Sequence, residues 1–173
     1  MKDNILFKRK AYEEMVQWKI SLADKYALLV EGARRVGKTH LIKEFVEKEY
    51  ESCIFIDFSS KSPLTNAAKR AFRQESSIQG LIERLTIISG VRLIEGHSCL
   101  VFDEVQRFPQ AREMIKQFVE YGKYHYIESG SLLGIRTNVA NILIPSEEHK
   151  LNMYPMDFEE FLDALGETVL KKA

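Results

Sequence analysis

Short apolar segments alternate along the chain with longer stretches in which apolar residues recur at helical spacing. The short segments predict strands, which we place at residues 26–30, 53–58, 99–102, 124–127 and 150–154. The longer stretches predict helices, which we place at residues 6–20, 38–50, 78–88, 111–121 and 157–165. Strands that alternate with helices are typical of an α/β fold built on a parallel sheet.

Local signals refine this pattern at two places. Between the second and third strands, Pro63 marks a turn or the start of a helix, and Gly96 ends the helical stretch before the third strand. Asp157 precedes the last predicted helix, and Glu160 stands three positions later. This spacing predicts a capping box, in which each side chain accepts a hydrogen bond from the other residue's backbone N–H.

Composition excludes several classes of protein. The chain has 173 residues, of which 45% are hydrophobic and 29% charged, and this suits one globular domain over residues 1–173. Its 25 basic and 25 acidic residues cancel, so it lacks the excess charge of a nucleic-acid-binding platform. Without a membrane span or a leader with an apolar core, we expect a cytoplasmic protein. Cys53 and Cys99 stand in apolar runs and predict buried thiols.

Residues 32–39 read Gly-Ala-Arg-Arg-Val-Gly-Lys-Thr and fit the phosphate-loop pattern Gly-x-x-x-x-Gly-Lys-Ser/Thr. They follow a predicted buried strand and open a predicted helix, as that pattern requires. The glycines let backbone N–H groups approach phosphate oxygens, Lys38 supplies positive charge to the β- and γ-phosphates, and the Thr39 hydroxyl is a ligand for Mg²⁺. We expect ATP with Mg²⁺ to bind at Gly32, Ala33, Arg34, Arg35, Val36, Gly37, Lys38, Thr39 and His40. The pattern leaves open whether the two arginines contact phosphate or are solvated loop residues.

The strand predicted at residues 99–102 ends in two acids, Asp103 and Glu104. After a phosphate loop, this arrangement predicts that Asp103 holds Mg²⁺ or its waters, and that Glu104 orients and deprotonates the attacking water. Asp57 also ends a strand and is the rival metal ligand, but no second acid follows it, so we expect it to cap a loop near the acidic strand end. Ser129 follows the fourth strand, where its hydroxyl can reach the γ-phosphate or the water.

Four stretches of the sequence carry a family resemblance. They are Gly-Ala-Arg-Arg-Val-Gly-Lys-Thr at 32–39, Phe-Asp-Glu-Val-Gln-Arg-Phe-Pro at 102–109, Ser-Gly-Ser-Leu-Leu at 129–133 and Met-Tyr-Pro-Met-Asp-Phe-Glu-Glu-Phe at 153–161. Together they resemble the prokaryotic AAA-type ATPases, in the subgroup with an N-terminal ATPase domain and a C-terminal domain of unknown function. The opening Phe-Lys-Arg-Lys-Ala-Tyr at 7–12 is similar to the start of that subgroup.

The resemblance implies a fold and a set of roles. The fold is an AAA+ core of the P-loop NTPase class, with a parallel five-stranded sheet of order 5-1-4-3-2 flanked by helices. Lys38 and Thr39 would lie in the phosphate site, Asp103 on Mg²⁺, Glu104 at the water as base, and Ser129 at the position of the first sensor residue. The same sheet order places Cys53 and Cys99 on adjacent strands.

Three departures from the family pattern bear on hydrolysis more than on nucleotide binding. Glu128 occupies a strand position that is usually apolar in such proteins, and the segment 144–148 lacks a glycine that relatives often carry. The chain ends where the family's C-terminal part would begin, so we expect it to lack a lid and a second sensor arginine. Arg107 and Arg136 are the candidates for an arginine that acts on a neighbouring subunit, and surface charge is the alternative for both.

Two functions fit these residues best. The first is an ATPase that hydrolyses ATP with Mg²⁺ to switch a neighbouring domain, a protein partner or another copy of the chain. The second is a truncated core that binds nucleotide and turns it over negligibly. The Asn-Lys-x-Asp motif of GTPases is missing from the sequence, and nothing in it indicates the acceptor pocket and lid of a kinase. The adjacent Asp103 and Glu104 favour water as the acceptor, and therefore hydrolysis.

Overall fold

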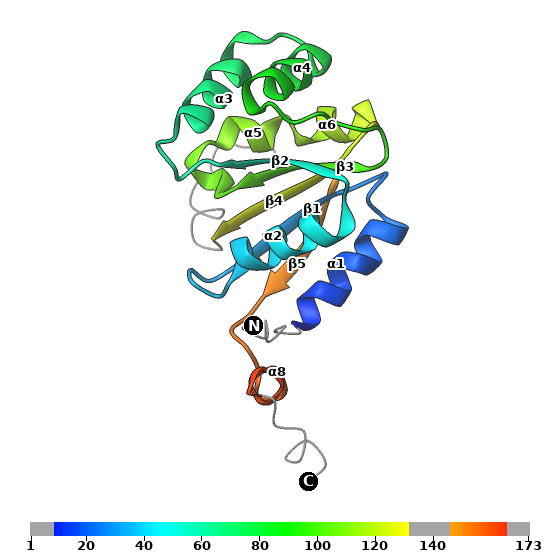
Figure 1. Ribbon diagram of the computed structural model, residues 1–173, viewed down its shortest axis with the longest axis vertical. Coiled ribbons are helices and arrows are strands. Elements are labelled where there is room, and N and C mark those ends of the chain that lie inside the picture. Colours follow the sequence, from blue (N-terminus) through cyan, green and yellow to red (C-terminus); the bar gives the residue numbers. More distant parts are fainter. Residues whose placement is uncertain (1–8, 132–145, 166–173) are drawn as a thin grey trace.

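A five-stranded parallel sheet forms the centre of the protein, and helices lie on both of its faces (Figure 1). The structure is a computed structural model that describes residues 9–131 and 146–165. The strands lie in the order β2-β3-β4-β1-β5, and all four pairings are parallel. Read from the other edge, this is the order 5-1-4-3-2, so the predicted fold class and sheet order are confirmed.

Each predicted strand is present within a few residues of its expected ends. The strands are β1 (Ala27–Gly32), β2 (Ser52–Asp57), β3 (Ser98–Asp103), β4 (His125–Ser131) and β5 (Glu148–Met153). Cys53 lies opposite Cys99 in the β2–β3 pairing, which confirms that the two cysteines are on adjacent strands. In the same pairing Asp57 lies opposite Asp103. Because the strands are parallel, their carboxyl ends, and the side chains that follow them, meet along one edge of the sheet.

Within residues 9–131 and 146–165, helices and one short 3₁₀ turn precede, separate and follow the strands. They are α1 (Lys10–Ser21), α2 (Lys38–Glu49), α3 (Pro63–Gln74), α4 (Ile78–Ser89), η1 (Val105–Arg107), α5 (Pro109–Glu113), α6 (Ile115–Tyr121) and α8 (Phe158–Ala164). The irregular region after β2 contains α3 because Pro63 occupies its first position and Ser62 caps it. The Ser62 Oγ accepts a hydrogen bond from the Thr65 N–H at 3.1 Å.

The prediction of one continuous helix over residues 111–121 is wrong. Two helices, α5 and α6, occupy this stretch, and they meet at Met114. The backbone of Met114 has φ −89° and ψ −2°, which departs from α-helical values and interrupts the helix. The start of the first predicted helix, residues 6–8, lies outside the described residues.

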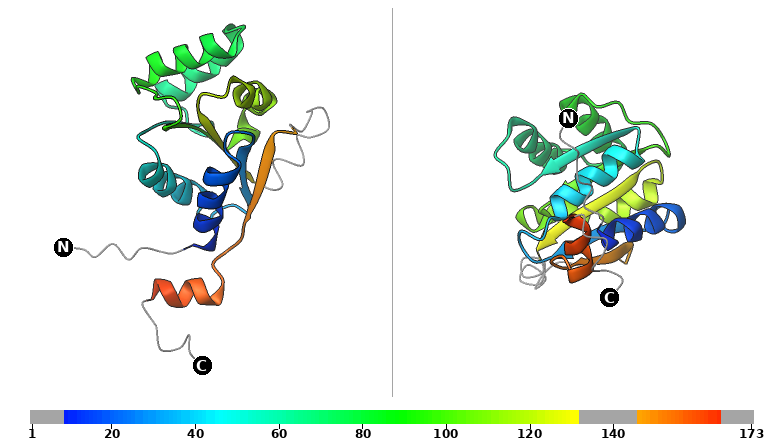
Figure 2. Two further views of the ribbon diagram at one scale, coloured as in Figure 1. Left: turned by 90° about the vertical axis from the view of Figure 1, so that its right-hand side faces the viewer. Right: turned by 60° about the horizontal axis from the view of Figure 1, so that its bottom comes forward.

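The two faces of the sheet carry two separate apolar cores, because successive side chains of a strand point to opposite faces. One core packs α1 and α2 against the sheet, with Trp18 and Phe45 among its largest side chains. The other packs α3, α4, α5 and α6 against the opposite face around Phe72, Phe102 and Phe118. Figure 2 shows these layers on either side of the strands. The phosphate-loop helix α2 thereby packs against β1 and β2.

A buried group of charged side chains lies on the second face. Glu128 of β4 is fully buried, and its Oε2 lies 4.0 Å from the Nε of Arg112 on α5. Arg112 donates two hydrogen bonds of 2.8 Å to the carboxylate of Glu148 on β5. The departure noted in the sequence is therefore a carboxyl group inside the sheet, beside an arginine that already binds another carboxylate.

The last described helix, α8, lies beyond the carboxyl end of β5, apart from both helical layers (Figures 1 and 2). The predicted capping box is present: the Asp157 Oδ1 accepts from the Glu160 N–H at 2.8 Å, and the Glu160 Oε2 accepts from the Asp157 N–H at 3.0 Å. Among the helices within residues 9–131 and 146–165, none has the length and apolar character needed to cross a membrane.

Candidate functional site

The phosphate loop runs from the end of β1 to the start of α2. Gly37 has φ +95°, a left-handed conformation that favours glycine, and it immediately precedes the first residue of α2. Gly32 is required for space, because a Cβ there would lie 2.2 Å from the carbonyl oxygen of Met153 on β5. The two glycines of the motif are thus needed for different reasons. Gly37 is needed for its backbone conformation, and Gly32 for the close packing of β1 against β5.

The Lys38 side chain lies inside this loop and is 5% exposed. Its Nζ donates hydrogen bonds to the carbonyl oxygens of Gly32 at 3.1 Å and Ala33 at 2.8 Å. Burial lowers the pKa of Lys38, and the carboxylates of Glu104 and Asp103 oppose that shift. The ammonium group is therefore held at the centre of the loop, with two carboxylates close enough to act on its charge.

Asp103 joins the phosphate loop to the neighbouring strands. Its Oδ2 accepts a hydrogen bond from the Thr39 Oγ at 2.8 Å, and its Oδ1 accepts one from the hydroxyl of Ser129. Burial raises the pKa of this carboxyl, while the bonds from Ser129 and Thr39 oppose the rise. A hydroxyl, a carboxylate and a second hydroxyl from α2, β3 and β4 therefore meet directly beside Lys38.

Glu104 follows Asp103 in a left-handed backbone conformation, with φ +57°. Its N–H donates a hydrogen bond of 3.2 Å to the Ser129 Oγ, and its side chain accepts one from Gln106. Glu104 is only partly buried, whereas Asp103 and Ser129 are buried. The turn thus leaves the Asp103 side chain buried and the Glu104 side chain accessible to solvent.

Asp57 plays the role expected of it as a loop cap. Its Oδ1 accepts hydrogen bonds from the N–H and the Oγ of Ser59, at 2.8 and 2.6 Å. Its backbone carbonyl accepts a bond of 3.0 Å from the Thr65 hydroxyl at the start of α3. Asp57 lies beside Asp103 in the sheet, but its side chain is engaged with the loop after β2.

The predicted arginines and His40 lie on the surface. Arg34 and Arg35 are exposed in the phosphate loop, and Arg35 has φ +66°. His40 is exposed one position after Thr39, and Arg107 is exposed at the end of η1. Arg136 lies outside the described residues.

A mainly apolar cavity of about 220 Å³ opens beside the phosphate loop. Its lining comes from the loop, from α2 and from the segment after β5, and comprises Arg9, Arg35, Val36, Gly37, His40, Leu41, Glu44, Met153 and Met156. Of these, Leu41 and Glu44 on α2 were not predicted as site residues. Neither were Arg9, Met153 and Met156, which lie far from the loop in the sequence. The sequence signal was indirect, because these three residues stand in or near stretches that carry the family resemblance, but neither stretch has a recognised phosphate-binding pattern.

The family comparison covers all of this site except Arg9. The chain matches a family model described as an AAA domain over residues 24–162, which include the phosphate loop, Asp103, Glu104 and Ser129. Comparison with curated protein sequences gave no match. Among solved structures the chain is similar to PCH-2 of C. elegans, with 13% sequence identity and a TM-score of 0.44. That likeness covers 94% of this chain and 43% of PCH-2, so the chain spans less than half the length of that protein.

Proposed function

Because the chain belongs to the AAA domain family, we propose that it binds ATP with Mg²⁺ and hydrolyses it to switch a neighbouring domain or a protein partner. The observation that carries this proposal is the meeting of Thr39, Asp103 and Ser129 next to Lys38, joined by the hydrogen bonds described above. Three separate segments of the chain converge there on one point at the mouth of the phosphate loop. A structural turn without a ligand would not need a buried ammonium and a buried carboxylate side by side.

The phosphate groups would bind to the loop through its N–H groups and through Lys38. The N-terminus of α2 adds aligned N–H dipoles that favour an anion. The Lys38 ammonium would exchange its two carbonyl bonds for phosphate oxygens, which are stronger acceptors because they are charged. The loop therefore offers both the backbone donors and the charge that a triphosphate requires.

The oxygen atoms of Thr39 and Asp103 suit Mg²⁺, which prefers hard oxygen ligands and keeps several waters. They are 2.8 Å apart, so one ion could contact both atoms or their bound waters. Among the residues that the structure describes, no group of three or more His, Cys, Asp or Glu side chains forms a metal cage, which is consistent with an ion held mainly by phosphate and water. When bound, Mg²⁺ would neutralise charge that develops on the phosphates.

Hydrolysis would use Glu104, which follows β3, and Ser129 of β4. Glu104 is the more exposed acid and would accept a proton from a water that attacks the γ-phosphate. The Ser129 hydroxyl contacts both acids and can adjust with the state of the phosphate. The apolar cavity of about 220 Å³ would hold the base, with Val36, Leu41, Met153 and Met156 among its lining residues.

A binding titration with Mg²⁺ and ATP tests the site. We expect Lys38→Ala to weaken binding about 100-fold while the fold is kept, because a charged hydrogen-bond donor is lost from the phosphates. Lys25→Ala removes an exposed lysine elsewhere and should bind as the unaltered chain does. Equal affinity in the chain and in Lys38→Ala would overturn the site.

A turnover assay separates the ATPase from the non-hydrolysing module. If Glu104 is the base, Glu104→Gln should bind ATP normally and release phosphate at least about 100-fold more slowly. Negligible phosphate release from the unaltered chain, with ATP bound, would favour the non-hydrolysing alternative. Equal and measurable release from the unaltered chain and from Glu104→Gln would instead remove Glu104 as the base.

A further inference from the structure

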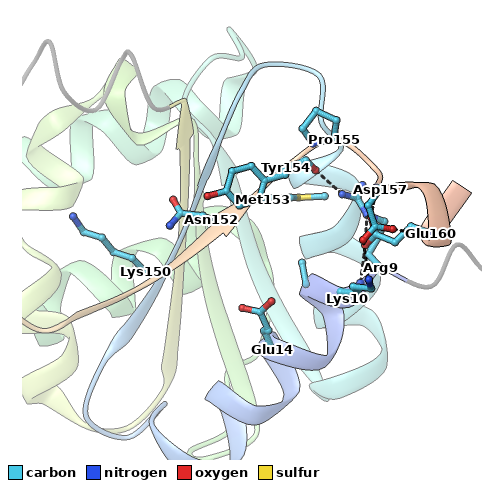
Figure 3. Close-up of a pocket in the computed structure, with 11 residues that line it drawn as sticks. Arg9, Lys10, Glu14, Lys150, Asn152, Met153, Tyr154, Pro155, Asp157 and Glu160 are labelled. Atoms are coloured by element: carbon cyan, nitrogen blue, oxygen red, sulfur yellow. Dashed lines mark hydrogen bonds and ion pairs between the residues drawn. The ribbon is translucent and has the colours of Figure 1, made fainter.

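Arg9 connects the phosphate loop to the segment that leads to α8. Its side chain is 12% exposed. One terminal nitrogen donates to the carbonyl oxygen of Val36 in the loop at 3.1 Å, and the other donates to the carbonyl oxygen of Tyr154 at 2.7 Å. The Nε lies 3.3 Å from the Glu160 Oε1. Figure 3 shows Arg9 beside Glu160 and the backbone after β5. A single guanidinium thus contacts the phosphate loop, the segment after β5 and the start of α8.

The acceptor Glu160 also holds the start of α8. Its Oε1 accepts from the Lys10 N–H at 2.8 Å as well as from Arg9, and its Oε2 accepts from the Asp157 N–H at 3.0 Å. The Glu160 side chain is 8% exposed, so these bonds are shielded from water. The carboxylate that closes the capping box of α8 is therefore the same one that binds Arg9. Displacement of α8 would break the bonds of Glu160 to Arg9 and Lys10, whereas the capping box would move with the helix.

Two methionines place this segment at the cavity wall. Met153 and Met156 flank Tyr154, whose carbonyl Arg9 binds, and both line the cavity of about 220 Å³. Val36, whose carbonyl Arg9 also binds, lines the same cavity. Arg9 therefore bonds to two segments that both line the cavity, the phosphate loop and the segment after β5.

We propose that Arg9 is a positioning residue for the nucleotide base, and that it links occupation of the base cavity to the docking of α8. This inference rests on the proposed function, since the ligand of the cavity is the base of the bound nucleotide. A nucleotide that packs against Met153 and Met156 stabilises the docked segment, and the docked segment in turn raises nucleotide affinity by the same factor. The position of α8 thereby depends on whether a nucleotide occupies the site.

The first test compares ATP with tripolyphosphate, which has the phosphates but no base. We expect Arg9→Ala to weaken ATP about tenfold or more and to change the affinity for tripolyphosphate by less than about twofold. Arg9→Lys keeps the charge but loses the planar arrangement of donors. Its ATP affinity should therefore lie between that of the unaltered chain and that of Arg9→Ala. Arg70→Ala removes an exposed arginine on α3 and should bind both ligands normally.

Three outcomes would overturn the inference. Unchanged ATP affinity in Arg9→Ala would show that Arg9 does not position the base. An equal loss for ATP and tripolyphosphate would show that Arg9 supports the phosphate loop itself. Failure of the unaltered chain to bind either ligand would instead overturn the proposed function, from which this inference starts.

Hydrogen exchange tests the link to α8. The N–H of Phe161 bonds to the Asp157 carbonyl at 2.9 Å, and the N–H of Leu165 bonds to the Phe161 carbonyl at 3.1 Å. We expect ATP to slow exchange at these amides in the unaltered chain. In Arg9→Ala and Arg9→Lys, at saturating ATP, the slowing should be lost or reduced. If ATP leaves these amides unaffected in the unaltered chain, α8 is not linked to the site.

Discussion

Ser129 is the residue through which the two acids of the site depend on each other. Its hydroxyl donates to Asp103 and accepts from the N–H of Glu104. Glu104 is held with φ +57°, which costs a residue other than glycine about 1–2 kcal/mol. The bond from the Glu104 N–H helps to offset that cost, so the direction of the Glu104 side chain depends on a hydroxyl from a different strand.

The buried Glu128 predicts an unusual dependence of stability on pH. Burial raises its pKa well above the usual 4.5, Glu148 raises it further, and Arg112 opposes the rise. The folded chain therefore retains a proton that the unfolded chain releases above about pH 4.5. The contribution to stability is complete below that pH and is lost as the pH rises toward the folded pKa, by at most about 1.4 kcal/mol per pH unit.

Glu128→Gln tests this prediction, because glutamine stays neutral and can donate to Glu148. We expect its free energy of unfolding to exceed that of the unaltered chain at pH 8, and the difference to shrink toward pH 5. Urea unfolding at several pH values measures this. Glu47→Gln, an exposed change on α2, should show no such trend. A difference independent of pH would exclude proton uptake by Glu128 as the cause.

At the scale of elements, the close approach of β5 to β1 shapes the phosphate loop. Gly32 ends β1 against the backbone of Met153, the last residue of β5. The loop therefore begins at a place where two strands touch through their main chains. A side chain at position 32 would push β5 outward, and would move with it Met153 and Met156, which line the base cavity.

Gly32→Ala should destabilise the chain by about 3 kcal/mol, because its Cβ would meet a backbone oxygen that no side-chain rotation can move. Gly96→Ala is the matched control. Gly96 has φ +72° with open space around it, so its cost is one of conformation alone, about 1 kcal/mol. Chemical denaturation measures both. Equal losses would contradict the steric account of Gly32.

The sequence predicted the strands well, because a buried strand in a parallel sheet is apolar along its whole length. The helix α3 was harder to predict, since its buried face is built largely from small residues, Ala68 and Ala71, with Phe72. Asp103, Glu104 and Ser129 could be placed near the phosphate loop because all lie at or near the carboxyl ends of parallel strands. Arg9 could not, because its bond to Glu160 spans 151 positions and depends on how two distant segments pack.

At the scale of the whole molecule, ligand binding and stability are linked. A ligand that binds only the folded chain, at 100 times its dissociation constant, adds about 2.7 kcal/mol to the free energy of unfolding. For a chain of this size we expect ATP with Mg²⁺ to raise the melting temperature by about 5–10 °C. Lys38→Ala should show little rise, and removal of Mg²⁺ with a chelator should reduce it. A shift of equal size in Lys38→Ala would place the ligand elsewhere.

The order of strands in the sheet has a consequence for synthesis. β1 lies between β4 and β5, both of which come from the far end of the chain. During translation, the nucleotide-binding motif therefore emerges from the ribosome long before the two strands that flank β1. Until those strands emerge, β1 has no neighbouring strand, so we expect nucleotide binding to contribute to folding only after β4 and β5 have been synthesised.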